Sequence, residues 1–103
     1  EFICTFFLMF CILMIFSAPN VPLPAGFGPY CVALLIVAIG LSLGGCSGYA
    51  MNMARDLGPR IAFAILPIPN KGSGNWGYAW VPCIAPMAGA LVAAVVARAL
   101  GVA

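Results

Sequence analysis

The sequence has 103 residues, of which 65% are hydrophobic and 6% are charged, and its mean hydropathy is +1.17. A water-facing domain of this size carries about a quarter charged residues, so the composition excludes an ordinary globular protein in water. The net charge of +2 comes from scattered cations without a basic run, which excludes nucleic acid as a partner. We therefore expect a chain whose solvent is largely lipid.

The chain opens on an unbroken apolar run over residues 2–16, which predicts a first membrane span over about 1–17. As a helix this run covers about 22 Å, short of the roughly 30 Å of a bilayer core. We therefore expect the first turn or two of the span to precede Glu1. Repeated Pro and Gly residues make 17–29 a predicted loop.

A second apolar stretch predicts a span over about 29–46. Gly40, Gly44 and Gly48 recur every four residues, a spacing that predicts a stripe which the backbone of a neighbouring helix can approach. Glycine also weakens a helix, so we expect this helix to give way to extended chain between Gly44 and Ala50.

The third predicted element, about residues 53–66, is a helix of some 20 Å, too short to cross a bilayer. Asn52 is a favoured N-cap, so the helix should begin at Met53 and aim its free N–H groups back toward Asn52. Its charges lie near its start and its apolar residues near its end. This pattern suits a half-helix, which enters the membrane within protein and does not cross it.

A pore wall is the chemistry that this half-helix predicts. Its positive dipole end favours electron-rich oxygen and repels cations, and an intramembrane arginine such as Arg55 normally lines a watery cavity. If residues 48–50 are extended, their carbonyls must face water, protein or a permeant molecule. Donors beside acceptors suit a neutral solute that both donates and accepts hydrogen bonds, such as water or a polyol.

The last predicted span covers about 78–101 and follows an aqueous loop and a predicted interfacial aromatic belt of Trp76, Tyr78 and Trp80. Small residues recur along it every four positions and predict a close-packing face: Gly89, Ala93, Ala97 and Gly101. The predicted fold is thus an all-α membrane protein with three transmembrane helices and one re-entrant half-helix.

From Glu1 to about Arg98 the sequence resembles the second half of an aquaglyceroporin, the glycerol-facilitator branch of the major intrinsic proteins. The family signature is Asn-Pro-Ala followed by Arg; Asn52, Ala54 and Arg55 match it, whereas Met53 replaces the proline. Asp56 after the arginine resembles the glycerol branch and not the water-selective one. The resemblance implies that residues 1–103 are the C-terminal repeat of an aquaporin-like channel.

The resemblance also implies a role for each matching residue. The implied pore motif is Asn52, Met53 and Ala54. The implied selectivity filter is Arg55, Tyr49 and Gly40. The implied pore-lining carbonyls are those of Gly48, Tyr49 and Ala50. Glu1 is implied to brace the loop that carries these carbonyls, and Asp56 to give structural support.

The function that this implies is a passive channel for glycerol and small uncharged solutes, with water, in the plasma (cytoplasmic) membrane. The chain would be a multi-pass half-channel that lacks its N-terminal half, and complete protomers would form a homotetramer in the lipid bilayer. The alternatives are a water-selective aquaporin, a non-conducting fragment or half of a secondary transporter. At residue level, Arg55 and Asp56 could instead form a neighbouring structural pair.

Enzymatic activity is not expected. The sequence has no His, no paired carboxylates within reach and no nucleophile beside a base. Its five cysteines have no metal-binding spacing and suit small apolar packing residues, so we expect neither a metal nor a cofactor.

Overall fold

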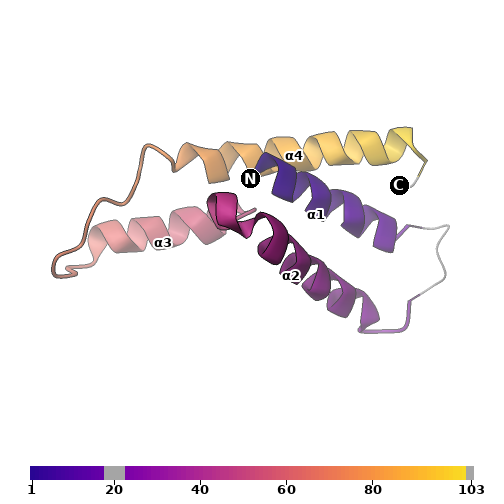
Figure 1. The fold of residues 1–103 in the computed structure, drawn as a ribbon, viewed down its shortest axis with the longest axis horizontal. Helices are drawn as coiled ribbons and strands as arrows, with labels where there is room; N and C mark the ends of the chain where they lie inside the picture. The colour runs from indigo at the N-terminus through magenta and orange to yellow at the C-terminus, as the bar shows by residue number, and fades with distance from the viewer. Residues whose placement is uncertain (18–22, 102–103) are drawn as a thin grey trace.

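The computed structural model describes residues 1–17 and 23–101, and in this part of the chain the regular structure is entirely helical. The helices are α1 (Phe2–Ile15), α2 (Phe27–Ser47), α3 (Met53–Ile65) and α4 (Trp80–Ala99) (Figure 1). Their ends fall within two residues of the predicted ranges. Of the predicted loop over 17–29, residues 18–22 lie outside the described part, and α2 already begins at Phe27.

The helices differ in whether they are long enough to cross a membrane. By length and composition α2, with 21 residues, and α4, with 20, could cross one. With 14 residues, α1 is apolar but covers only about 21 Å. Two of the described helices therefore meet the length criterion, where the sequence predicted three spans.

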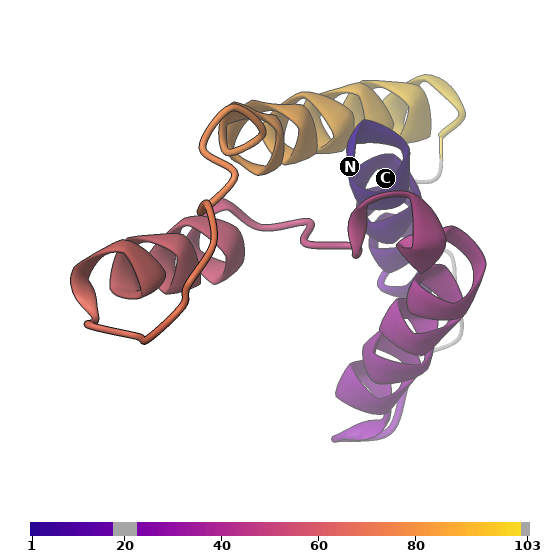
Figure 2. The same cartoon turned by 60° about the vertical axis from the view of Figure 1, so that its left-hand side comes forward.

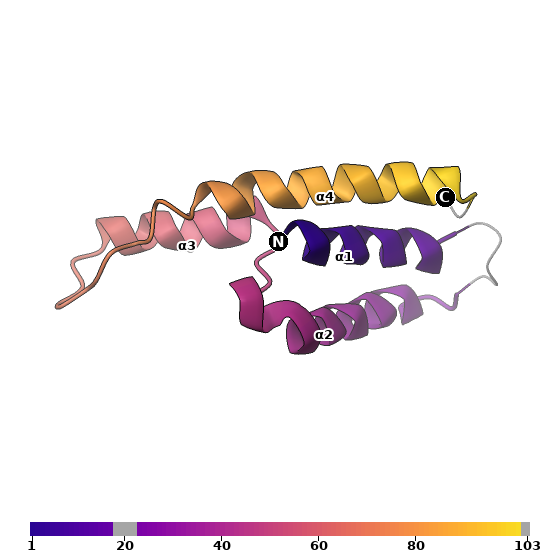
Figure 3. The ribbon, with the colours of Figure 1, turned by 45° about the horizontal axis from the view of Figure 1, so that its top comes forward.

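Helix α4 connects two parts of the fold, because both α1 and α3 pack along it. Figure 3 shows α1 and α3 on the same side of α4, with their N-terminal ends pointing toward each other. Among the described helices, α2 packs against α1. Figure 2 shows the segment between α2 and α3 crossing from one helix pair to the other. The start of α3 is thereby held near the N-terminus of α1.

The contact between α1 and α4 depends on small residues. One face of α4 is buried, and it consists of Pro82, Pro86, Gly89, Ala93 and Ala97. A Cβ atom on Gly89 would overlap the Phe2 carbonyl oxygen and lie 3.2 Å from the Phe6 nitrogen. The predicted close-packing face is confirmed for Gly89, Ala93 and Ala97. Gly101 is exposed beyond the end of α4, so its inclusion was wrong.

The end of α2 lies within the predicted stretch, but the chain after it differs from the prediction. The helix continues through Gly44 to Ser47 and ends at Gly48, whose φ of 80° is the left-handed conformation that glycine adopts easily. After it, Tyr49 and Met51 have φ angles of 43° and 51°, so residues 48–51 are not simply extended chain. The predicted helix end is therefore confirmed, whereas the extended conformation predicted after it was wrong, because packing holds this segment in another conformation.

That packing comes from Tyr49, whose ring covers the glycine stripe of α2. A Cβ on Gly40 would lie 3.1 Å from the Tyr49 Cζ atom, and one on Gly44 would lie 2.9 Å from Cδ1. The stripe was predicted to receive the backbone of a neighbouring helix. In the described structure it receives an aromatic ring of its own chain, so the absent side chains make room for Tyr49.

We expect Gly89→Ala to destabilise the helix pair α1–α4 by about 1–3 kcal/mol, because the new methyl group would overlap backbone atoms that cannot rotate away. Gly45→Ala is the matched control, since a Cβ on this exposed helical glycine meets nothing within 4 Å. Thermal unfolding in detergent micelles, followed by circular dichroism, compares the two variants. Equal unfolding midpoints would contradict the packing described above.

Candidate functional site

The start of α3 is fixed by Asn52. This residue is extended, with φ −163° and ψ 124°, and its Oδ1 atom accepts hydrogen bonds from the Ala54 and Arg55 amides at 2.8 and 3.2 Å. The helix therefore begins at Met53, as predicted from the N-cap. The amide of a first helical residue needs no partner within the helix, so methionine is accommodated where the signature has proline.

The Glu1 carboxylate organises the segment that precedes α3. Its Oε1 atom accepts hydrogen bonds from the Ser47 hydroxyl at 2.7 Å and the Ala50 amide at 2.9 Å. Its Oε2 atom accepts one from the Met51 amide at 2.6 Å. Left-handed backbone at Tyr49 and Met51 is unfavourable for residues with a Cβ atom. The charge-assisted hydrogen bonds offset this cost.

The carbonyls of this segment are left without such partners. Within residues 1–17 and 23–101, none of the hydrogen bonds is donated to the carbonyl oxygens of Gly48, Tyr49 or Ala50. A backbone carbonyl remains a strong acceptor that needs a donor from water, protein or a bound molecule. The Ala50 and Met51 amides point toward Glu1, and the carbonyls of residues 48–50 have no donor in the described structure. Such carbonyls can form a wall of hydrogen-bond acceptors.

Tyr49 brings the three residues of the predicted filter together. Its ring lies against Gly40, and the Arg55 Cζ atom is 5.9 Å from the centre of the same ring, within range of a cation–π contact. Arg55 is exposed. The sequence has two acidic residues, and in the described structure Glu1 binds the segment before α3 while Asp56 binds Arg60. Arg55 thus has no acidic partner there.

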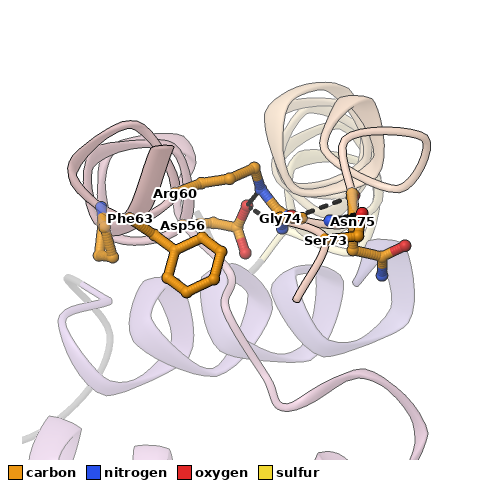
Figure 4. Close-up of a pocket in the computed structure, with 7 residues that line it drawn as sticks. Asp56, Arg60, Phe63, Ser73, Gly74 and Asn75 are labelled. Atoms are coloured by element: carbon orange, nitrogen blue, oxygen red, sulfur yellow. Dashed lines mark hydrogen bonds and ion pairs between the residues drawn. The ribbon is translucent and has the colours of Figure 1, made fainter. Parts of the chain in front are cut away.

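Asp56 pairs with Arg60, one turn further along α3, so the alternative of an Arg55–Asp56 pair is wrong. The Arg60 Nη2 and Asp56 Oδ2 atoms are 2.8 Å apart. Arg60 also donates from Nη1 to the carbonyl oxygens of Gly74 and Asn75, the latter at 3.0 Å (Figure 4). Asp56 therefore orients the arginine that ties α3 to the loop before α4.

A cavity of about 350 Å³ lies beside this tie, between α3 and the loop. It is lined by Asp56, Pro59, Arg60, Phe63, Ser73, Gly74 and Asn75. The polar groups of Arg60 that face it are already engaged with Asp56 and the loop carbonyls. The cavity is therefore a consequence of the tie between α3 and the loop.

Sequence reasoning missed the contacts of two cations, Arg60 and Lys71. Lys71 lies in the aqueous loop predicted before the last span, over residues 67–77, and its Nζ atom donates to the carbonyl oxygens of Phe63, Ala64 and Leu66 at 3.0, 3.1 and 3.0 Å. The sequence did indicate the need for the Lys71 contacts, because α3 ends before a proline and has no capping glycine. A helix end of this kind predicts carbonyls that need an external donor.

Comparison with known proteins gives the following matches. The family model described as Major intrinsic protein matches residues 1–97. The chain is 54% identical over 96 residues to the glycerol uptake facilitator protein of Streptococcus pneumoniae serotype 4, covering 93% of this chain and 40% of that protein. It is 50% identical over 100 residues to glycerol uptake facilitator protein 3 of Lactiplantibacillus plantarum, covering 97% and 40%.

A third relative has a different printed name. The D/L-lactic acid transporter of Lactiplantibacillus plantarum is 59% identical over 70 residues, covering 67% of this chain and 29% of that protein. No solved structure matches the chain significantly. The chain spans about 40% of the length of the first two relatives.

We expect Glu1→Gln to speed hydrogen exchange of the Ala50 and Met51 amides by roughly tenfold, because one amide oxygen cannot replace a carboxylate that binds through both oxygens. Exchange is measured by mass spectrometry on the chain in lipid nanodiscs. Ser47→Ala is the control, since it removes one hydrogen bond to Glu1 and leaves the hydrogen bonds from the Ala50 and Met51 amides in place. Exchange that is equally fast in the two variants would contradict the bracing role.

Proposed function

The chain belongs to the major intrinsic protein family, and from this premise we propose that it forms the second half of a pore for glycerol, small uncharged solutes and water. The observation that carries the proposal is the meeting of Gly40, Tyr49 and Arg55 beside the N-terminal end of α3. Permeation makes and breaks no covalent bond, so this function needs positioned hydrogen-bond groups and no catalytic residue.

A polyol matches the groups at this end of α3. The Asn52 Oδ1 atom is engaged by backbone amides, which leaves the side-chain NH₂ group to donate to a hydroxyl. Arg55 supplies further donors, and the carbonyls of residues 48–50 supply acceptors for the same hydroxyls. The Tyr49 residue is 38% exposed, so the accessible part of its ring offers an apolar surface to the carbon chain of the solute. Each face of a polyol thus meets complementary chemistry.

Cations, including hydrated protons, are disfavoured by the same groups. The N-terminal end of α3 carries the positive end of the helix dipole, and the Arg55 charge adds to it. A neutral solute that exchanges hydrogen bonds with the wall avoids this repulsion. The proposal therefore combines passage of uncharged molecules with exclusion of protons.

In this proposal α1, α2 and α4 are the three spans of the C-terminal repeat and α3 is the re-entrant half-helix. Residues 1–103 are one repeat of a multi-pass protein of the plasma membrane, and complete protomers form a homotetramer. A pore of this kind needs a second half-helix tip opposite Asn52. The remaining part of a full-length protein, about 60% of the length of the relatives, is the source we propose for it.

The proposal favours glycerol over a strictly water-selective pore. Because Gly40 and Gly44 have no side chain, the Tyr49 ring packs closely against α2, and a larger residue at position 40 would displace it. One specific observation favours a further permeant: the D/L-lactic acid transporter shares 59% identity over 70 residues. Arg55 has guanidinium donors that match a carboxyl group, so lactic acid is a second candidate solute.

The proposal predicts that Arg55→Ala broadens solute selection. We would test it in a chimera in which this chain replaces the aligned part of the Streptococcus pneumoniae glycerol uptake facilitator protein. Without the Arg55 donors and charge, the permeability ratio of xylitol to glycerol should rise by roughly tenfold, a change of about 1.4 kcal/mol in discrimination. Stopped-flow light scattering of proteoliposomes measures both solutes.

Arg98→Ala is the matched control, because it removes an arginine from the last turn of α4, away from α3. This variant should keep the parent ratio. If Arg55→Ala keeps the parent ratio as well, Arg55 is not part of a selectivity filter.

A further inference from the structure

Within the described part of this chain, little apolar packing fixes the position of α3. None of its residues is buried, and among the described helices it packs only against α4. Buried apolar surface is what usually fixes a helix in place. Polar contacts hold the two ends of α3 instead. At the N-terminal end these are the Asn52 cap and the segment bound by Glu1.

The C-terminal end of α3 lacks the usual means of capping. Leu66 is extended, with φ −71° and ψ 138°, as expected for a residue before proline. Pro67 and Pro69 have no backbone N–H to offer the last carbonyls of the helix, and the Ile68 amide between them donates to the carbonyl oxygen of Leu66, after the helix, at 3.0 Å. The last turn also contains no basic residue. These carbonyls, and the negative end of the helix dipole, need a donor from elsewhere.

Lys71 supplies that donor. Asn70, at a φ of 57°, adopts the left-handed conformation that asparagine tolerates and turns the chain back toward the helix end. The Lys71 ammonium then donates to three carbonyls, those of Phe63, Ala64 and Leu66, and so uses all of its protons. It also lies 5.5 Å from the centre of the Phe63 ring. The Lys71 charge thus offsets the negative end of the α3 dipole. Its hydrogen bonds hold the loop against the end of the helix.

The same loop is fastened at a second point. Arg60, oriented by Asp56, holds the carbonyls of Gly74 and Asn75. Asn75 in turn accepts a hydrogen bond from the Tyr78 amide at 3.0 Å, at the start of the turn that leads into α4. Lys71 and Arg60 therefore connect the end of α3 to the beginning of α4 through a short clamped loop.

We propose that Lys71 is a positioning residue, which holds α3 at a fixed depth along α4 and so sets where Asn52 and Arg55 stand at the opposite end. If the C-terminal end of α3 shifts along the helix axis, the N-terminal end, where Asn52 and Arg55 lie, shifts with it. Lys71 need not touch the solute for this. Its effect on solute selection rests on the proposed function, whereas its effect on the position of α3 does not.

Two variants separate positioning from a local role. Lys71→Met keeps the aliphatic stem and removes the ammonium; Lys71→Arg keeps a cation with several donors and should restore the contacts. Arg98→Met removes a cation of equal charge from α4 and is the control. Hydrogen exchange of the chain in nanodiscs is measured for residues 60–66 and, separately, for the Ala54 and Arg55 amides that Asn52 binds.

We expect Lys71→Met to speed exchange roughly tenfold over residues 60–66 and several-fold at Ala54 and Arg55, with Lys71→Arg and Arg98→Met close to the parent. In the chimera, Lys71→Met should raise the xylitol-to-glycerol ratio severalfold. Faster exchange confined to 60–66 would reduce Lys71 to a local cap and overturn the proposal. So would unchanged exchange at both ends. If the parent chimera passes no glycerol, the proposed function fails and exchange alone decides the role of Lys71.

Discussion

The arrangement of the site depends on one carboxylate. Glu1 binds the Ser47 hydroxyl and the Ala50 and Met51 amides, and so it joins the start of α1 to the end of α2 and to the segment that leads into α3. Without it, two amides of a left-handed segment would lose their partners. With it, the carbonyls of that segment are left available, and Tyr49 is held where its ring meets α2 and Arg55.

Two kinds of contact hold the helices together, each at a different place in the fold. Small residues let α1 approach α4 closely, as expected where lipid removes the hydrophobic drive between helices. Charged groups hold α3 and its flanking segments instead. Five of the six charged residues are used there, namely Glu1, Arg55, Asp56, Arg60 and Lys71. The few charged residues that this composition contains are therefore concentrated in α3 and in the segments that flank it.

The sequence predicted what is encoded locally. The beginning of α3 followed from Asn52, because a cap acts on amides two and three residues away. The conformation of the segment after α2 could not be predicted this way, since Tyr49 folds back over Gly40 and Gly44 only in three dimensions. The contacts of Lys71 and Arg60 cross a loop with two prolines and depend on its exact turn, which propensities do not specify. The pore roles came from the resemblance to the family signature and remain proposals.

The most direct test of the central claim, that this chain supplies one half of a glycerol pore, is glycerol permeability by stopped-flow light scattering. The chimera that carries this chain and the chain reconstituted alone would be compared with protein-free vesicles, while a pH-sensitive dye reports proton leakage. The account predicts glycerol flux without proton leakage for the chimera, and no selective flux for the chain alone. A chimera that folds and inserts but passes no glycerol would contradict the account.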